Sequence, residues 1–195
     1  MEPDWQGWAS ESPCFSDLIA ELRPSLVIEV DSWKGASLLK LAQASERLGL
    51  GSTFICIDTW LGYNVELWLH ATTRASLKLQ GGYPTIFRTF LRNLCDANLL
   101  QRVFPMPMTL LTAAMILRHR RLQADLSSIY AVHTQFAVET DLEAFSQLLR
   151  PGGVLLGDDY LPEWFGVIAA AQSFGRRHGL ALEQRQEKFL FRLSI

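Results

Sequence analysis

Acidic side chains and a histidine follow apolar segments of this 195-residue chain, at places where they could bind a ligand or move a proton. Asp158 and Asp159 follow the apolar run VLLG. Two adjacent carboxylates are costly unless a cation, a hydrogen-bond donor or water compensates them, which favours a metal-binding or catalytic role over a solvated surface. His133 follows SIYAV, where a histidine can act as a general base, although a lone histidine is more often structural.

Two further segment ends have the composition of a nucleotide-binding site. TFICI is followed by Asp58, and an acid at the end of a second strand can accept hydrogen bonds from a ribose diol or simply cap the next segment. LVIEV is followed by DSWKG and then by a helix-forming stretch whose start attracts anionic groups. The GxGxxG fingerprint of dinucleotide sites is absent, so a plain strand–helix turn stays an alternative for residues 31–35.

The elements that must position these residues alternate along the chain. Buried β-branched runs predict strands at 26–30, 53–60, 102–107, 125–133 and 154–160. Helical spacing falls between and after them, at 37–50, 85–100, 110–122, 138–149 and 164–179. The C-terminal segments LALEQRQ and KFLFRLS alternate like an antiparallel hairpin. We predict an α/β fold with a doubly wound, mostly parallel seven-stranded Rossmann-like sheet, which binds ligands at the carboxyl ends of its strands.

Composition narrows the class of protein. A hydrophobic content of 49% over 195 residues suits one globular domain, which we expect to span residues 1–195 with residues 1–24 as an aromatic cap segment. A net charge of −2 does not indicate the basic surface that nucleic-acid binding needs. Three cysteines without a CxxC motif disfavour a disulfide framework and structural zinc. Without a signal peptide or a long apolar span, we expect a cytoplasmic protein with no membrane partner, and homo-oligomer formation stays open.

Several stretches together resemble one family. IEVDSWKGAS is similar to an IEVGSWKGxS turn, CIDTWLG to a second-strand motif, HTQFAVETDL to an HxYxxVxxDL stretch, and LLRPGGVLLGDDY to a fifth-strand motif. In this order and spacing, the stretches resemble the class I S-adenosylmethionine-dependent methyltransferases. Within that class they resemble the branch grouped with cephalosporin-hydroxylase-like and macrocin-O-methyltransferase-like proteins. The likeness covers nearly the whole chain.

The resemblance implies a ligand set and a reaction. It implies that S-adenosylmethionine is bound at the two turns, by Glu29, Asp31, Ser32, Trp33, Gly35, Asp58, Thr59 and Trp60. It implies that Asp158 and Asp159 hold Mg²⁺, which positions a substrate hydroxyl. His133 and Asp158 would be the catalytic residues, with His133 deprotonating that hydroxyl before methyl transfer.

Two positions depart from the family pattern. Asp31 stands where the family has glycine, and its charge would repel the cofactor carboxylate by about 4 kcal/mol at 4 Å and an effective dielectric near 20. Tyr130 stands where the family has a metal-binding aspartate, and two acids alone hold magnesium weakly. Both departures fall on the site and leave the core pattern intact.

Three functions are therefore weighed. The motif set predicts an S-adenosylmethionine-dependent O-methyltransferase acting on a small hydroxylated molecule or a sugar. The departures at Asp31 and Tyr130 keep open a catalytically impaired methyltransferase-like protein with a scaffolding or regulatory role. A nicotinamide-dependent oxidoreductase needs a glycine-rich turn that this chain lacks.

Overall fold

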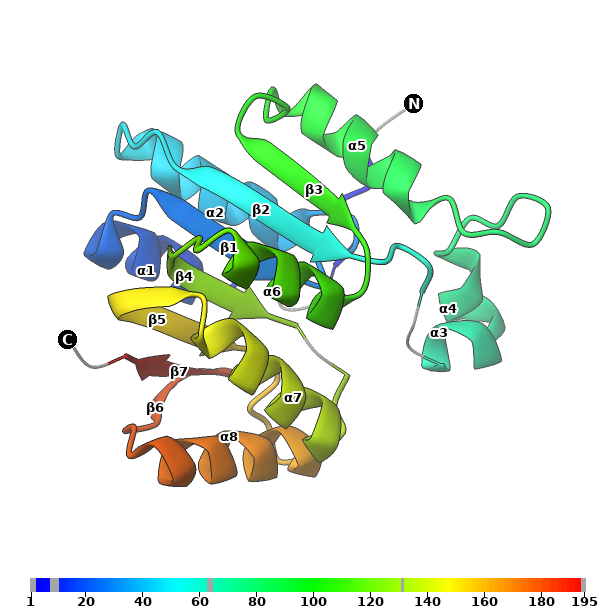
Figure 1. Cartoon of the computed structure of the whole chain (residues 1–195). Helices are drawn as coiled ribbons and strands as arrows, with labels where there is room; N and C mark the ends of the chain where they lie inside the picture. The colour runs from blue at the N-terminus through cyan, green and yellow to red at the C-terminus, as the bar shows by residue number, and fades with distance from the viewer. Residues whose placement is uncertain (1–2, 8–10, 63–64, 131, 194–195) are drawn as a thin grey trace.

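The computed structural model describes residues 3–7, 11–62, 65–130 and 132–193, and it contains a seven-stranded sheet in the order β3-β2-β1-β4-β5-β7-β6 (Figure 1). The strands are β1 (Leu26–Val30), β2 (Thr53–Asp58), β3 (Val103–Pro107), β4 (Ala124–Ile129), β5 (Leu149–Gly157), β6 (Glu183–Arg185) and β7 (Lys188–Arg192). β1 to β5 are parallel, β7 is antiparallel to β5, and β6 is antiparallel to β7. The predicted sheet and its C-terminal hairpin are confirmed.

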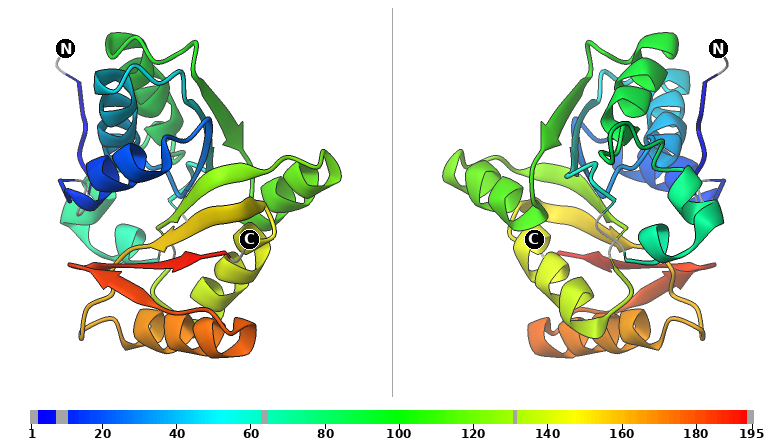
Figure 2. Two further views of the ribbon diagram at one scale, coloured as in Figure 1. Left: turned by 90° about the vertical axis from the view of Figure 1, so that its left-hand side faces the viewer. Right: turned by 90° about the vertical axis from the view of Figure 1, so that its right-hand side faces the viewer.

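Helices cover both faces of this sheet (Figure 2). α1 (Cys14–Leu22), α2 (Ala36–Arg47) and α5 (Ile86–Asp96) pack on one face, and α6 (Leu110–His119), α7 (Gln135–Ser146) and α8 (Phe165–His178) pack on the other. The short helices α3 (Glu66–Leu69) and α4 (Ala71–Ala75) lie in the connection between β2 and α5, which the sequence does not predict as helical. Because both faces are covered, the central strands are apolar on both sides.

The order of the strands explains where the sheet tolerates proline and where it can bind a ligand. β3 carries Pro105 and Pro107 and is an edge strand, paired only with β2 among the described strands, so the missing N–H groups cost little. The chain leaves β1 toward β2 and returns to the other side of β1 as β4. The carboxyl ends of β1 and β4 therefore form the switch point at which doubly wound sheets bind ligands.

Element boundaries differ from the prediction around β4. The strand ends at Ile129 instead of reaching His133, and α7 begins at Gln135 instead of Val138. Thr134 explains the early start, because its hydroxyl accepts a hydrogen bond from Ala137 N and caps the helix. His133 thus lies in the loop between β4 and α7. In the described part of the chain, no helix is long and apolar enough to cross a membrane.

Candidate functional site

The turn after β1 requires left-handed backbone. Asp31 has φ 63°, Trp33 has φ 49° and Gly35 has φ 86°. Glycine adopts this region without strain, and aspartate is among the few other residues found there. This backbone explains why the resembling family has glycine where this chain has Asp31. The Asp31 N–H donates to Ile57 O at 2.8 Å, which fixes the turn to the end of β2.

Asp58 locks the two predicted cofactor turns together. One carboxylate oxygen accepts from Trp33 N at 2.9 Å, and the other accepts from Trp60 N at 2.6 Å. The Trp60 indole N–H adds another hydrogen bond between the two turns by donating to Trp33 O at 2.7 Å. Asp58 is buried, and this burial raises its pKa to about 6 despite the backbone hydrogen bonds. The Asp58 carboxylate thus accepts hydrogen bonds from the protein's own backbone. This is the capping role that the sequence leaves open beside ribose binding.

The other residues predicted to bind the cofactor mostly lie beneath the turns. Glu29 has no exposed surface, accepts from Ser37 Oγ at 2.7 Å, and has its pKa raised to about 7 by burial. The Ser32 hydroxyl donates to Glu29 O at 3.4 Å, and the Trp60 ring is buried against two phenylalanines of α5. Thr59 is half-buried and accepts from Leu61 N. These side chains shape the turns.

The N-terminal segment packs against the first turn. Asp4 forms ion pairs with Lys34 at 2.9 Å and with Lys78 at 2.5 Å. Burial opposes ionisation of Asp4, but hydrogen bonds from the two lysines outweigh it and hold its pKa at about 2. The Trp33 indole donates to Gln6 at 2.9 Å, so the segment covers the outer side of the turn. Trp8 of the predicted aromatic cap lies outside the described residues, whereas Phe15 is buried in α1.

A cavity of about 470 Å³ opens at the switch point. Its walls come from the ends of three strands and the starts of two helices: Asp31, Thr109, Leu110, Leu111, Val132, Phe136, Ala137, Thr140 and Asp141. Asp31 is the one residue of the predicted cofactor set in this lining. Two other lining residues have a signal in the sequence, since Thr109 follows a predicted strand and Asp141 belongs to the HxYxxVxxDL stretch.

Asp141 is the second carboxyl group in the wall of the cavity. It is 7% exposed, and no hydrogen bond joins its side chain to another of the described residues. Burial raises its pKa to about 7. A buried carboxyl that faces a cavity without a protein partner is available to a ligand that donates a hydrogen bond.

The predicted base is held by a carboxylate. His133 Nε2 lies 2.8 Å from Asp159 Oδ2, and the imidazole stacks on the Trp164 ring with centroids 3.6 Å apart. His133 is 26% exposed at its side chain, so a substrate can reach it. An imidazole oriented by an acid is the arrangement that general bases use, because the acid fixes the tautomer and stabilises the imidazolium.

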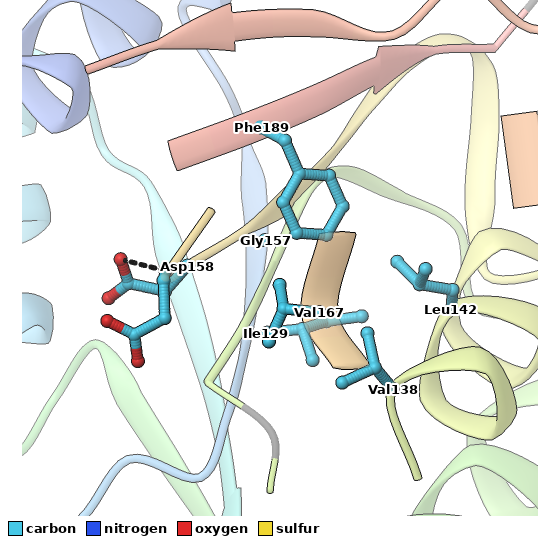
Figure 3. Close-up of a pocket in the computed structure, with 8 residues that line it drawn as sticks. Ile129, Val138, Leu142, Gly157, Asp158, Val167 and Phe189 are labelled. Atoms are coloured by element: carbon cyan, nitrogen blue, oxygen red, sulfur yellow. Dashed lines mark hydrogen bonds between the residues drawn. The ribbon is translucent and has the colours of Figure 1, made fainter. Parts of the chain in front are cut away.

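Asp158 belongs to a different pair. It is 9% exposed, and its Oδ1 accepts from the fully buried Lys188 ammonium at 2.7 Å and from Asp159 N at 2.8 Å. Figure 3 shows the Asp158 carboxylate pointing away from the apolar side chains that surround Phe189 and Val167. The cavity between those side chains holds only about 10 Å³, roughly the room for one water molecule.

These partners do not fit the predicted magnesium site. Asp158 is paired with Lys188 and Asp159 with His133, so the two carboxylates serve different partners. At the third position, Tyr130 brings a ring packed against the core in place of an acid. Throughout the described ranges, no group of three or more His, Cys, Asp or Glu side chains could hold a metal ion.

The sheet order and the cavity at its switch point define an α/β protein of the Rossmann-like methyltransferase fold. Residues 28–160 match the model of a family described as a methyltransferase domain, and the chain belongs to this family. No curated protein matches the chain.

Solved structures share the fold at low sequence identity. An O-methyltransferase from Bacillus cereus in complex with SAH is 15% identical with TM-score 0.69, over 99% of this chain and 84% of that one. The O-methyltransferase TomG from Streptomyces achromogenes, solved with SAM, is 14% identical with TM-score 0.67, over 98% and 82%. The SAH-bound methyltransferase PaMTH1 from Podospora anserina is 12% identical with TM-score 0.64, over 98% and 81%.

Proposed function

We propose that this protein is an S-adenosylmethionine-dependent O-methyltransferase that acts on a small hydroxylated molecule or a sugar. Membership of the methyltransferase-domain family supports the reaction class, and structural neighbours described as O-methyltransferases support oxygen as the acceptor atom. The observation that carries the proposal is the His133–Asp159 pair, because His133 is the next residue in the chain after Val132 of the cavity wall. We extend the proposal to the macrocin-O-methyltransferase-like branch on the strength of the sequence motifs.

The cavity fits a nucleoside-sized cofactor. Its volume of about 470 Å³ lies in the range of small-molecule sites, and its wall is apolar with a few polar groups. We assign Asp141 to a donor group of the cofactor and the Leu110 and Leu111 side to its apolar surface. Asp58 acts from beneath by fixing the backbone of the turns, and the Glu29 carboxyl accepts from the Ser37 hydroxyl of α2. When bound, the cofactor supplies a methyl group on a positively charged sulfur.

His133 would move the proton of the reaction. Because Nε2 is bonded to Asp159, we assign the imidazole proton to Nε2 and the lone pair to Nδ1. Nδ1 would take the proton of the substrate hydroxyl, which would leave the oxygen free to accept the methyl group that a bound cofactor would supply. Asp159 stabilises the imidazolium that results, and Trp164 holds the ring by stacking.

Asp31 favours a second candidate function. Its carboxylate lines the cavity and opposes the carboxylate of the cofactor, which supports a methyltransferase-like protein that has lost cofactor binding and acts as a scaffold or regulator. Cofactor binding separates the two functions, because only the enzyme needs it.

Calorimetric titration of the purified protein with S-adenosylmethionine and S-adenosylhomocysteine tests the proposal. We expect micromolar binding that is lost in Ala137→Phe, which fills the cavity, and kept in Ala75→Phe, which adds the same ring at an exposed position of α4. Absence of binding up to millimolar concentration would contradict the proposed function and favour the scaffold. Binding that survives Ala137→Phe would place the cofactor elsewhere.

A further inference from the structure

Lys188 is a fully buried cation at the carboxyl end of the sheet. Its ammonium lies 2.7 Å from Asp158 Oδ1, 4.7 Å from the centre of the Phe15 ring and 6.0 Å from the centre of the Tyr130 ring. Lysine is rarely buried unless it is paired, because the ammonium gives up its hydration. Its burial beside a predicted catalytic acid therefore calls for a reason.

The strands deliver Lys188 to the position of the predicted metal site. Gly157 of β5 pairs with Phe189 of β7, and the next residues, Asp158 and Lys188, face each other across the ladder. Tyr130 follows the neighbouring strand β4 on the same face, where its ring packs near Phe15 of α1. The ends of β4, β5 and β7 thus bring together a tyrosine, an aspartate and a lysine.

Charge explains how a tyrosine and a lysine can share this site. A buried carboxylate needs a compensating positive charge, which either a metal ion or an ammonium can supply. A divalent ion prefers several carboxylates, whereas a single ammonium is balanced by one. With Tyr130 in place of an acid, Asp158 is the carboxylate at hydrogen-bond distance from Lys188, and the more exposed Glu187 adds a longer contact at 3.6 Å. The tyrosine and the lysine are therefore compatible with one charge balance at this site.

We propose that Lys188 is the permanent cation of this site: it takes the place that a divalent metal would need beside Asp158, and it positions the base through Asp158 and Asp159. The contacts form a continuous chain. Lys188 bonds Asp158 Oδ1, the same oxygen accepts from Asp159 N, and Asp159 Oδ2 bonds His133. The Asp158 contact supports the left-handed backbone of Asp159, at φ 57°. Lys188 is a positioning residue, since its ammonium is out of reach of a substrate.

The positioning role rests on the proposed function, whereas the exclusion of metal does not. Manganese binding, followed by water-proton relaxation, tests the exclusion directly. We expect no Mn²⁺ binding by the wild-type protein up to millimolar concentration. Binding that Asp158→Asn removes would overturn the inference. The measurement needs no cofactor, so a protein that fails to bind both Mn²⁺ and S-adenosylmethionine would refute the proposed function and leave the exclusion standing.

The tautomer of His133 tests the positioning role. The chain has four histidines, so ¹⁵N-histidine NMR spectra are simple, and His133→Gln assigns the signal. We expect a single Nε2–H form in the wild type, a mixture of forms in Lys188→Met, and the wild-type form again in Lys188→Arg, which keeps the charge. An unchanged tautomer in folded Lys188→Met would overturn the role. If Lys188→Met does not fold, Asp158→Asn removes the same link at its other end and is read in the same way.

Discussion

Gly166, the second residue of α8, lies directly against the backbone of His133: a Cβ built on Gly166 would overlap the His133 carbonyl oxygen. Trp164, the N-cap of the same helix, stacks on the His133 ring. The start of α8 therefore fixes the proposed base from two sides, once through the backbone and once through the imidazole.

Gly166→Ala should displace the loop that carries His133. The new methyl group meets backbone atoms, which cannot swing away as a flexible side chain can, so we expect a loss of about 1–3 kcal/mol in unfolding free energy. Gly51→Ala is the control, because a Cβ there meets nothing within 4 Å, and its stability should be unchanged or slightly higher. Urea denaturation compares the unfolding free energies of the two variants. Equal values would show that the contact between Gly166 and the His133 backbone is not tight.

Asp31→Asn should strengthen cofactor binding. Asparagine tolerates the left-handed backbone that residue 31 adopts and removes the charge that opposes the cofactor carboxylate. We expect at least tenfold tighter binding of S-adenosylhomocysteine by calorimetry, within the roughly thousandfold limit set by an interaction of about 4 kcal/mol. Asp31→Ala removes the charge but not the backbone strain, so it should bind like Asp31→Asn while being less stable. Weaker binding in both variants would mean that Asp31 holds the cofactor ammonium.

The sequence predicted the sheet well because its signals are local. Apolar β-branched runs mark the strands, and the prolines of β3 mark an edge. The spacing of acids after β1, β2 and β5 also predicts one edge of the sheet for them, the edge at which the cavity lined by Asp31 opens. These features depend on residue type and order, which a sequence displays.

The partners within the site could not be predicted, because they depend on side chains that are distant in sequence. Lys188 lies 30 residues after Asp158, in a segment with the ordinary alternation of a strand. The resemblance implies a metal ligand at Asp159, whereas the backbone of Asp159, at φ 57°, places its side chain against His133. The sequence leaves ribose binding and capping open for Asp58, because the two backbone N–H groups that donate to it come from turns whose geometry the sequence does not specify.

Asp58→Asn should loosen both turns. The amide nitrogen of asparagine cannot accept a hydrogen bond, so one of the N–H groups of Trp33 and Trp60 loses its acceptor in a buried place. We expect a loss of about 1–3 kcal/mol in unfolding free energy. Asp96→Asn is the control, since Asp96 is partly exposed and its contact with Arg92 is a surface pair of 3.6 Å, which contributes little. Chemical denaturation measures the unfolding free energy of both variants. Equal losses would contradict the role of Asp58 in holding the two turns together.

Burial of Glu29 should make the protein less stable as the pH rises. The pKa of Glu29 is raised by burial from 4.5 to about 7, so the folded state holds its proton at pH values where the unfolded state has released it. The contribution of Glu29 to the stability of the folded protein is fully present below about pH 4.5, and it is lost as the pH rises through about 7. The loss is on the order of 3 kcal/mol, as an upper limit. Asp58 and Asp141, with pKa values raised to about 6 and about 7, act in the same direction.

Glu29→Gln isolates this effect. Glutamine keeps an oxygen that accepts from Ser37 and cannot ionise, so the variant should gain stability over the wild type as the pH rises from 5 to 8. Glu46→Gln, on the exposed side of α2, is the control and should run parallel to the wild type. Urea unfolding at four pH values across this range measures the difference between the curves. A constant difference would show that Glu29 stays ionised in the folded protein and that its hydrogen bonds outweigh the cost of burial.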